Sequence, residues 1–227
     1  MSKYFIDKTV KLLVCDMAGT TVNERGIVYK TLYETIKGYD IYIEPEEMKS
    51  WYGINKTQVL EHFLDRDTEY KDNKEAILPQ MLNSFKKNLK NNYSKDGSIS
   101  LIDNELPQLF NEFRSKGIKI ALNSGFSVDI QRELIKNLKM DTFIDEFISS
   151  EEVPHGRPEP YMIEELMKRC DISDSNQVIK IGDSINDILE GKTAKCYASI
   201  GVLSGAENMD NLINNGADAV IESVMGL

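Results

Sequence analysis

An α/β fold built on a doubly wound parallel sheet is predicted by two patterns in this 227-residue sequence. The first is an alternation, from about residue 106 onward, between short apolar runs and amphipathic segments of about ten residues. Such alternation specifies right-handed β–α–β crossovers and a parallel sheet with helices on both faces. The second is a helical stretch without a good strand, at about 28–93, which interrupts the pattern after its first strand. We therefore expect a sheet core carrying an inserted helical unit.

The first expected strand is the apolar run at 10–15, which stops at Asp16 as a buried parallel strand would. In the helical stretch, Pro45 followed by two glutamates marks a helix start. Asn55 is placed to cap the next helix, and another helix is expected at 77–89. Apolar residues share one face of the helix that follows the cap, at Val59, Leu60, Phe63 and Leu64.

Beyond the helical stretch, each expected helix is followed by a strand. The helices are expected at 106–116, 129–138, 159–169, 185–194 and 209–215, and the strands at 117–123, 143–149, 178–182, 197–202 and 217–221. The division that follows is a core of residues 1–22 and 99–227, with a helical insert at 23–98. A core with a smaller inserted domain suits this chain length.

Composition excludes several classes of protein. Hydrophobic residues make up 41% of the chain, which is enough for a normal core. The formal charge of -10 disfavours a general nucleic-acid binder or a membrane-surface protein, and no apolar run reaches membrane-spanning length. The three cysteines form no Cys-x-x-Cys pair, and residues 1–7 lack the apolar stretch of a signal peptide. We expect a cytoplasmic protein that neutralises any anionic substrate locally, with a metal or a few placed cations.

Polar residues stand at the carboxyl ends of the expected strands, where open parallel sheets bind their ligands. Asp16 ends the first strand, Ser124 follows the next, and Asp183 ends another, with Asp187 four residues further on. A loop ahead of one helix adds Arg157. Clustered carboxylates repel one another unless a hard cation lies among them, and oxygen ligands suit Mg²⁺.

This set of residues can carry out phosphoryl chemistry. Arg157 and Ser124 would clamp the oxygens of a phosphoryl group, and Asp16 would attack phosphorus to form an aspartyl phosphate. The plainer interpretation is that Asp16 and Asp183 are helix caps at strand-to-helix turns. That interpretation serves well for either aspartate alone, but the Gly-Thr-Thr and Gly-Asp-Ser contexts together favour the site.

In combination, these segments resemble the four motifs of the haloacid dehalogenase superfamily. The segments are Asp-Met-Ala-Gly-Thr-Thr-Val at 16–22, Ser124-Gly125, Arg157, and Gly-Asp-Ser-Ile-Asn-Asp at 182–187. The resemblance covers nearly the whole chain and implies a Rossmann-like core with a C1-type helical cap. It implies that Asp16 is the nucleophile, that Mg²⁺ is the cofactor, and that the substrate is a small organophosphorus compound, not a nucleic acid or a membrane. A homodimer is compatible with it.

The resemblance also assigns roles to single residues. The implied metal ligands are Asp16, the backbone carbonyl of Ala18 and Asp183, with Asp187 as a further acidic support. The implied phosphoryl-binding residues are Thr20, Ser124, Gly125 and Arg157.

Ala18 stands where most phosphatases of the superfamily have a second aspartate as general acid, and Arg157 replaces the usual lysine. Both changes resemble the phosphonatase-like branch, whose phosphonoacetaldehyde hydrolases cleave a carbon–phosphorus bond. Those enzymes form a Schiff base on a cap lysine three residues after a glycine, and Gly53 and Lys56 match that spacing.

Lys56 can also be interpreted without the family. It extends the apolar stripe of its helix and lies in the first turn, where the helix dipole disfavours a cation. Both factors lower the pKa of its amine and favour attack on a carbonyl. The alternative is a lysine whose stem lies along the stripe and whose amine reaches water.

Other positions depart from the branch. Val59, Tyr52, Phe126 and Gly26 stand where it has a histidine, a methionine, a tyrosine and a cysteine. We therefore expect a hydrolase that cleaves the carbon–phosphorus bond of phosphonoacetaldehyde or a relative. Two alternatives stay open: a phosphatase for esters with good leaving groups, and a phosphate-binding protein without turnover.

Overall fold

The computed structural model describes residues 6, 9–44, 46–67, 69–93 and 98–227. Its centre is a six-stranded sheet with the order β5-β4-β1-β6-β7-β8, in which every neighbouring pair of strands is parallel. The strands are β1 (Leu12–Asp16), β4 (Lys119–Ser124), β5 (Glu146–Ser149), β6 (Val178–Gly182), β7 (Ala198–Val202) and β8 (Ala219–Ile221). The predicted parallel α/β fold is thus confirmed. The first strand lies in the middle because the chain crosses to β4 on one side of it and to β6 on the other.

Side chains of β1 alternate between two apolar clusters, one on each face of the sheet. Leu13 and Cys15 pack in a cluster that includes side chains of α4 (Leu106–Ser115) and α5 (Val128–Asn137). Leu12 and Val14 pack in the other cluster, with side chains of α6 (Tyr161–Arg169). A strand covered on both faces reads as a continuous apolar run, which is why β1 was recognisable. The helices α7 (Ile185–Thr193) and α8 (Met209–Asn214) follow β6 and β7.

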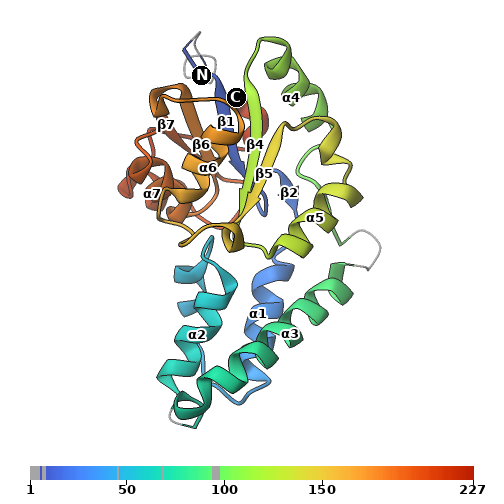
Figure 1. Cartoon of the computed structure of the whole chain (residues 1–227), viewed down its shortest axis with the longest axis vertical. Helices are drawn as coiled ribbons and strands as arrows, with labels where there is room; N and C mark the ends of the chain where they lie inside the picture. The colour runs from blue at the N-terminus through green and yellow to red at the C-terminus, as the bar shows by residue number, and fades with distance from the viewer. Residues whose placement is uncertain (1–5, 7–8, 45, 68, 94–97) are drawn as a thin grey trace.

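Three α-helices make up most of the described residues of the inserted part, and they lie together below the sheet in Figure 1. They are α1 (Ile27–Lys37), α2 (Lys56–Arg66) and α3 (Lys74–Tyr93), and α3 packs against both of the others. The predicted cap of α2 is confirmed, since the Asn55 side chain accepts a hydrogen bond from the backbone N–H of Thr57 at 2.8 Å. The four apolar residues predicted on one face of α2 are all fully buried.

Two local expectations differ from the structure. Pro45 lies outside the described residues, and the helix that follows it, Glu47–Trp51, is a 3₁₀ helix. The strand expected from 143 begins only at Glu146, because a 3₁₀ turn at Met140–Thr142 precedes it.

A two-stranded antiparallel ribbon was not predicted. It pairs β2 (Val22–Asn23) with β3 (Ser100–Leu101), where the chain leaves the sheet core for the helices and returns from them. Strands of two residues are too short to show an apolar period. Within the described part of the chain, no helix has the length and apolar character needed to cross a membrane.

Candidate active site

Asp16 is buried at the carboxyl end of β1, and the loop after it turns back tightly. Three successive backbone N–H groups, from Thr20 to Val22, lie 2.7–3.2 Å from the carbonyl oxygen of Met17. Gly19 has a φ of 86°, and a Cβ there would lie 2.5 Å from a carboxylate oxygen of Asp183. Glycine therefore lets this loop approach Asp183, the aspartate that follows β6.

Asp183 is not a helix cap. Ser184 caps α7, its hydroxyl accepting from the N–H of Asp187, whose carboxylate bonds back to Ser184. The Asp183 carboxylate instead accepts hydrogen bonds from the Ala206 N–H at 2.8 Å and the Thr20 hydroxyl at 3.3 Å. Each of Asp16, Asp183 and Asp187 has a carboxylate oxygen within 4.8 Å of those of the other two. The interpretation of Asp16 and Asp183 as mere helix caps is therefore wrong.

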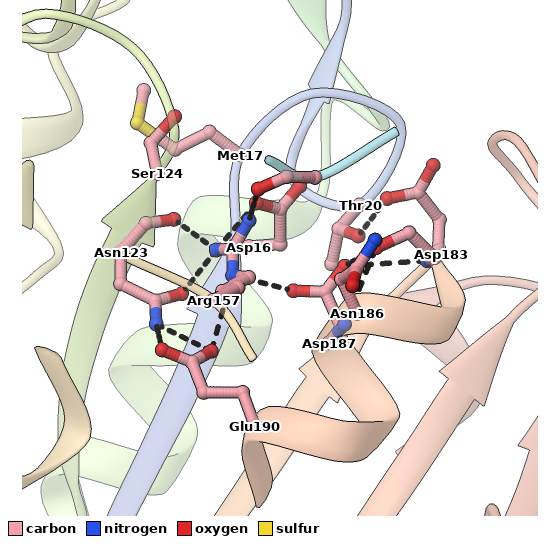
Figure 2. Close-up of polar contacts among 12 residues, drawn as sticks. Asp16, Met17, Thr20, Asn123, Ser124, Arg157, Asp183, Asn186, Asp187 and Glu190 are labelled. Carbon is pink, nitrogen blue, oxygen red and sulfur yellow. Dashed lines mark hydrogen bonds and ion pairs between the residues drawn. The ribbon is translucent and has the colours of Figure 1, made fainter. Parts of the chain in front are cut away.

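Arg157 connects the aspartates to the neighbouring strand (Figure 2). Its Nη2 atom lies 2.7 Å from Oδ1 of Asp16, and its Nε atom lies 3.1 Å from both Asp187 and Glu190. The same guanidinium donates to the backbone and side-chain oxygens of Asn123, at 3.0 and 2.6 Å. The Arg157 side chain is 1% exposed, so these contacts lie in a low-dielectric environment, where they hold its orientation firmly.

A second buried cation supports Arg157 and was missed from the sequence. The Nζ atom of Lys180 lies 2.8 Å from Asp187, 3.4 Å from Glu190 and 2.8 Å from the side-chain oxygen of Asn123. Lys180 and Glu190 are fully buried. One signal could have found Lys180: it interrupts the apolar residues of β6, and a buried lysine needs charged partners.

The structure divides the predicted phosphoryl-binding residues. Ser124 and Gly125 line the same cleft as Asp16 and Arg157, and the Ser124 hydroxyl accepts from the N–H of Phe126 at 3.1 Å. Thr20 is fully buried, does not line that cleft, and donates its hydroxyl proton to Asp183. Thr20 thus orients the carboxylate of Asp183. Of the four predicted phosphoryl-binding residues, Thr20 alone does not line the cleft.

Lys56 enters the cleft from the first turn of α2. The residue is 7% exposed, and its amine donates to the carbonyl of Ile54 at 2.7 Å instead of reaching water. Burial, together with the positive charge of Arg157, lowers the pKa of Lys56 to about 8. The amine lies 4.8 Å from the ring centre of Tyr29. Tyr29 is a further residue of the site that was not predicted from the sequence.

Tyr29 projects from α1 into the same cleft. Its hydroxyl oxygen accepts the backbone N–H of Gly53 at 2.8 Å. Burial and the negative charge of Asp183 raise the pKa of Tyr29 well above its ordinary value, so the hydroxyl stays protonated. The sequence offered no signal, because a tyrosine on an amphipathic helix is ordinarily a packing residue.

The buried carboxylates show where a cation fits. Burial raises the pKa of Asp16 to about 6, and burial with the charge of Asp16 raises that of Asp183 well above its ordinary value. Against its burial, the charges of Arg157 and Lys180 hold the pKa of Asp187 below its usual range. Protein cations thus already neutralise Asp187. For Asp16 and Asp183, the nearby positive charge does not offset the effects of burial and of the neighbouring carboxylates. A hard divalent cation between those two fits the donor set.

Two adjoining cavities lie at the site. The cleft has a volume of about 20 Å³, room for little more than one water molecule. A larger cavity of about 290 Å³ shares Ala18, Tyr29 and Asp183 with it and extends between the β1 loop and the helical part. The cleft is lined by Asp16, Ala18, Val28, Tyr29, Gly53, Lys56, Ser124, Gly125, Phe126, Arg157 and Asp183.

Comparisons with known proteins agree on one family. The model of the haloacid dehalogenase-like hydrolases matches residues 13–200. A phosphonoacetaldehyde hydrolase of Parabacteroides distasonis is 26% identical over 216 residues, covering 89% of this chain and 79% of the relative. One of Bacteroides fragilis is 25% identical over 218 residues, with the same coverage.

Solved structures share the fold. A hydrolase from Pseudomonas syringae superposes with a TM-score of 0.80 at 17% identity, covering 96% of this chain and 95% of that one. A phosphonoacetaldehyde hydrolase-like protein from Oleispira antarctica has a TM-score of 0.78 at 21% identity, covering 95% and 89%. At such identities the likeness establishes the architecture.

Proposed function

Because the chain belongs to the haloacid dehalogenase-like hydrolases, we propose that it cleaves the carbon–phosphorus bond of a small phosphonate, with Mg²⁺ as cofactor. The observation that carries this proposal is the buried amine of Lys56 in the same cleft as the carboxylate of Asp16. An amine with a lowered pKa suits attack on a carbonyl, and a carboxylate beside a buried guanidinium suits attack on phosphorus. Ala18, which lines the cleft, offers no acid for an ordinary alcohol leaving group.

The first half of the chemistry takes place at Lys56. Its neutral amine adds to the aldehyde carbon of phosphonoacetaldehyde or a relative, and loss of water leaves an iminium. The iminium draws the electron pair of the carbon–phosphorus bond onto carbon as an oxygen of Asp16 bonds to phosphorus. The products are an enamine on Lys56 and an aspartyl phosphate on Asp16. Protonation and hydrolysis of the enamine release acetaldehyde, and water releases phosphate from Asp16.

The phosphoryl group is held by protein cations and donors. Arg157 approaches it from beside Asp16, and Ser124 and Gly125 lie in the same wall. Asp16, Asp183 and the carbonyl of Ala18 would hold Mg²⁺, which supplies positive charge that offsets repulsion between the nucleophile and the anionic substrate. The network of Lys180 and Glu190 keeps the guanidinium aligned.

The closed geometry and the second cavity bear on the substrate. The cleft of about 20 Å³ is too small for a whole phosphonate, so we infer that the helical part acts as a cap that opens for entry and closes for reaction. The adjoining cavity of about 290 Å³ leaves room for an organic part larger than that of phosphonoacetaldehyde. The relatives named for that substrate support the reaction type for this chain at about a quarter sequence identity.

A second candidate is a phosphatase for esters with good leaving groups. Val59, at the position of the branch's histidine, is fully buried in the apolar cluster and does not line the cleft. The Lys56 amine donates to the carbonyl of Ile54 and would have to leave it to attack a carbonyl. In this alternative Asp16 and Arg157 act as above, and Lys56 contributes charge alone.

The test is a comparison of products and adducts. Wild type with Mg²⁺ should release phosphate and acetaldehyde in equal amounts from phosphonoacetaldehyde, and chelation should stop both. Borohydride added during turnover should reduce the imine to a stable adduct on the peptide containing Lys56, absent in Lys56→Arg. If no adduct forms and Lys56→Arg is as fast as wild type, the phosphatase alternative replaces the proposal.

A further inference from the structure

Tyr29 packs its ring beside the amine of Lys56, and its hydroxyl group belongs to the same cleft. The amine lies 4.8 Å from the centre of the tyrosine ring, and both side chains line the cleft that holds Asp16. The hydroxyl oxygen accepts a hydrogen bond from the N–H of Gly53 at 2.8 Å, and this bond holds the hydroxyl in place. No described residue accepts the hydroxyl proton, so that proton is available to a molecule in the cleft.

Few other groups in the cleft can move a proton at the amine. The cleft wall contains no histidine, and Phe126 has no hydroxyl. Ser124 carries a hydroxyl, but it lies at the end of β4, and its oxygen is engaged by the N–H of Phe126. Asp16 and Asp183 are assigned above to phosphorus and to the metal. Among the groups that line the cleft, Tyr29 is the residue that both packs against Lys56 and carries a hydroxyl with no other role in the chemistry.

We propose that Tyr29 is a catalytic residue that relays the proton between nitrogen and oxygen when Lys56 adds to the carbonyl of the substrate. The nitrogen lone pair forms the carbon–nitrogen bond, and the carbonyl π pair moves onto oxygen. That oxygen takes the proton of the Tyr29 hydroxyl, while Tyr29 takes one from the ammonium nitrogen. The carbinolamine is then neutral and Tyr29 is unchanged, so no phenolate accumulates. This inference rests on the proposed function, because it needs the imine on Lys56.

Tyr29→Phe is the direct test, and Tyr52→Phe is the matched control. The Tyr52 ring stacks on Tyr29 with centroids 4.0 Å apart, but Tyr52 lines only the larger cavity. Borohydride trapping with phosphonoacetaldehyde should slow by about 10² to 10⁴-fold in Tyr29→Phe, the usual range for a lost acid–base group. Trapping in Tyr52→Phe should stay near the wild-type rate.

Hydrolysis of 4-nitrophenyl phosphate separates this role from a structural one. The carbonyl of Gly53 lies 3.4 Å from Arg157, so a Gly53 loop displaced by loss of the tyrosine hydroxyl would disturb the phosphoryl site as well. Hydrolysis of this ester needs no imine, so we expect it to fall far less in Tyr29→Phe than borohydride trapping does. A parallel loss with both substrates would overturn the relay, as would wild-type trapping in Tyr29→Phe. If the wild type itself forms no adduct, the proposed function fails, not this residue's role alone.

Discussion

The guanidinium of Arg157 directly contacts the carboxylate of Asp16, with 2.7 Å between Nη2 and Oδ1. The two side chains are 1% and 7% exposed, so the ion pair is almost fully removed from water. Arg157 therefore orients one oxygen of the carboxylate before any substrate is present, and the same cation is available to a phosphoryl group beside it. A nucleophile and its electrostatic support thus form a single preorganised unit.

Asp16→Asn should abolish phosphate release from every substrate, because an amide cannot form the acyl phosphate. The fall in kcat should be at least about 10³-fold. Thermal melting should still show a cooperative transition, since Arg157 keeps its contacts with Asp187 and Glu190. The exposed Asp141 provides the control, and Asp141→Asn should be fully active. Substantial activity in purified Asp16→Asn would contradict nucleophilic catalysis by this residue.

Asp183→Asn should act chiefly on the metal. Its carboxylate is oriented by Ala206 and Thr20 toward Asp16, and an amide in its place offers a weaker ligand. We expect the Mg²⁺ concentration for half-maximal activity to rise by roughly ten-fold or more. Wild type should also melt at a higher temperature with saturating Mg²⁺, and the variant should lose most of that increase. An unchanged Mg²⁺ titration would remove Asp183 from the metal site.

Glu190→Gln should weaken both stability and turnover. The fully buried carboxylate contacts Arg157 and Lys180, and its loss leaves two buried cations with less compensation. Breaking a buried pair typically costs about 3–5 kcal/mol. Glu165→Gln, which removes an exposed contact with Arg169, should leave the free energy of unfolding nearly unchanged. Denaturant unfolding and kcat measure the two effects, and equal behaviour of both variants would contradict a positioning role for Glu190.

The pH profile should depend on the substrate. Only the neutral amine of Lys56 attacks a carbonyl, and its pKa is lowered to about 8. Phosphonoacetaldehyde cleavage should therefore increase with pH up to about 8 and then level off. Hydrolysis of 4-nitrophenyl phosphate should lack this limb, because it does not use the amine. Superimposable profiles for the two substrates would argue against an amine nucleophile.

Ala18 should make the enzyme selective among phosphate esters. With no carboxylic acid at this place in the cleft, alkyl esters should be slower than 4-nitrophenyl phosphate by about 10² to 10⁴-fold. Ala18→Asp should narrow that gap by protonating the alcohol as it leaves. Sugar phosphates hydrolysed by the wild type at the rate of the aryl ester would show that another group supplies the proton.

Periodicity and strand order made much of the fold and part of the site predictable. Apolar runs alternating with amphipathic segments require a parallel sheet, and the carboxyl ends of its strands meet at one edge. Asp16, Ser124 and Asp183 therefore had to lie near one another once their strands were recognised. The burial of Lys56 agreed with its apolar stripe for the same reason, since that stripe has to face other side chains.

Only the tertiary structure decided which partners each charged group meets. Lys180 and Glu190 come together with Arg157 because β6, α7 and the loop after β5 pack around one point, and no sequence period records that contact. Tyr29 reaches Lys56 through the packing of two helices that are separate along the chain. The pKa shifts follow from this packing as well, because burial and neighbouring charges move the pKa of a side chain away from the ordinary value of its residue type.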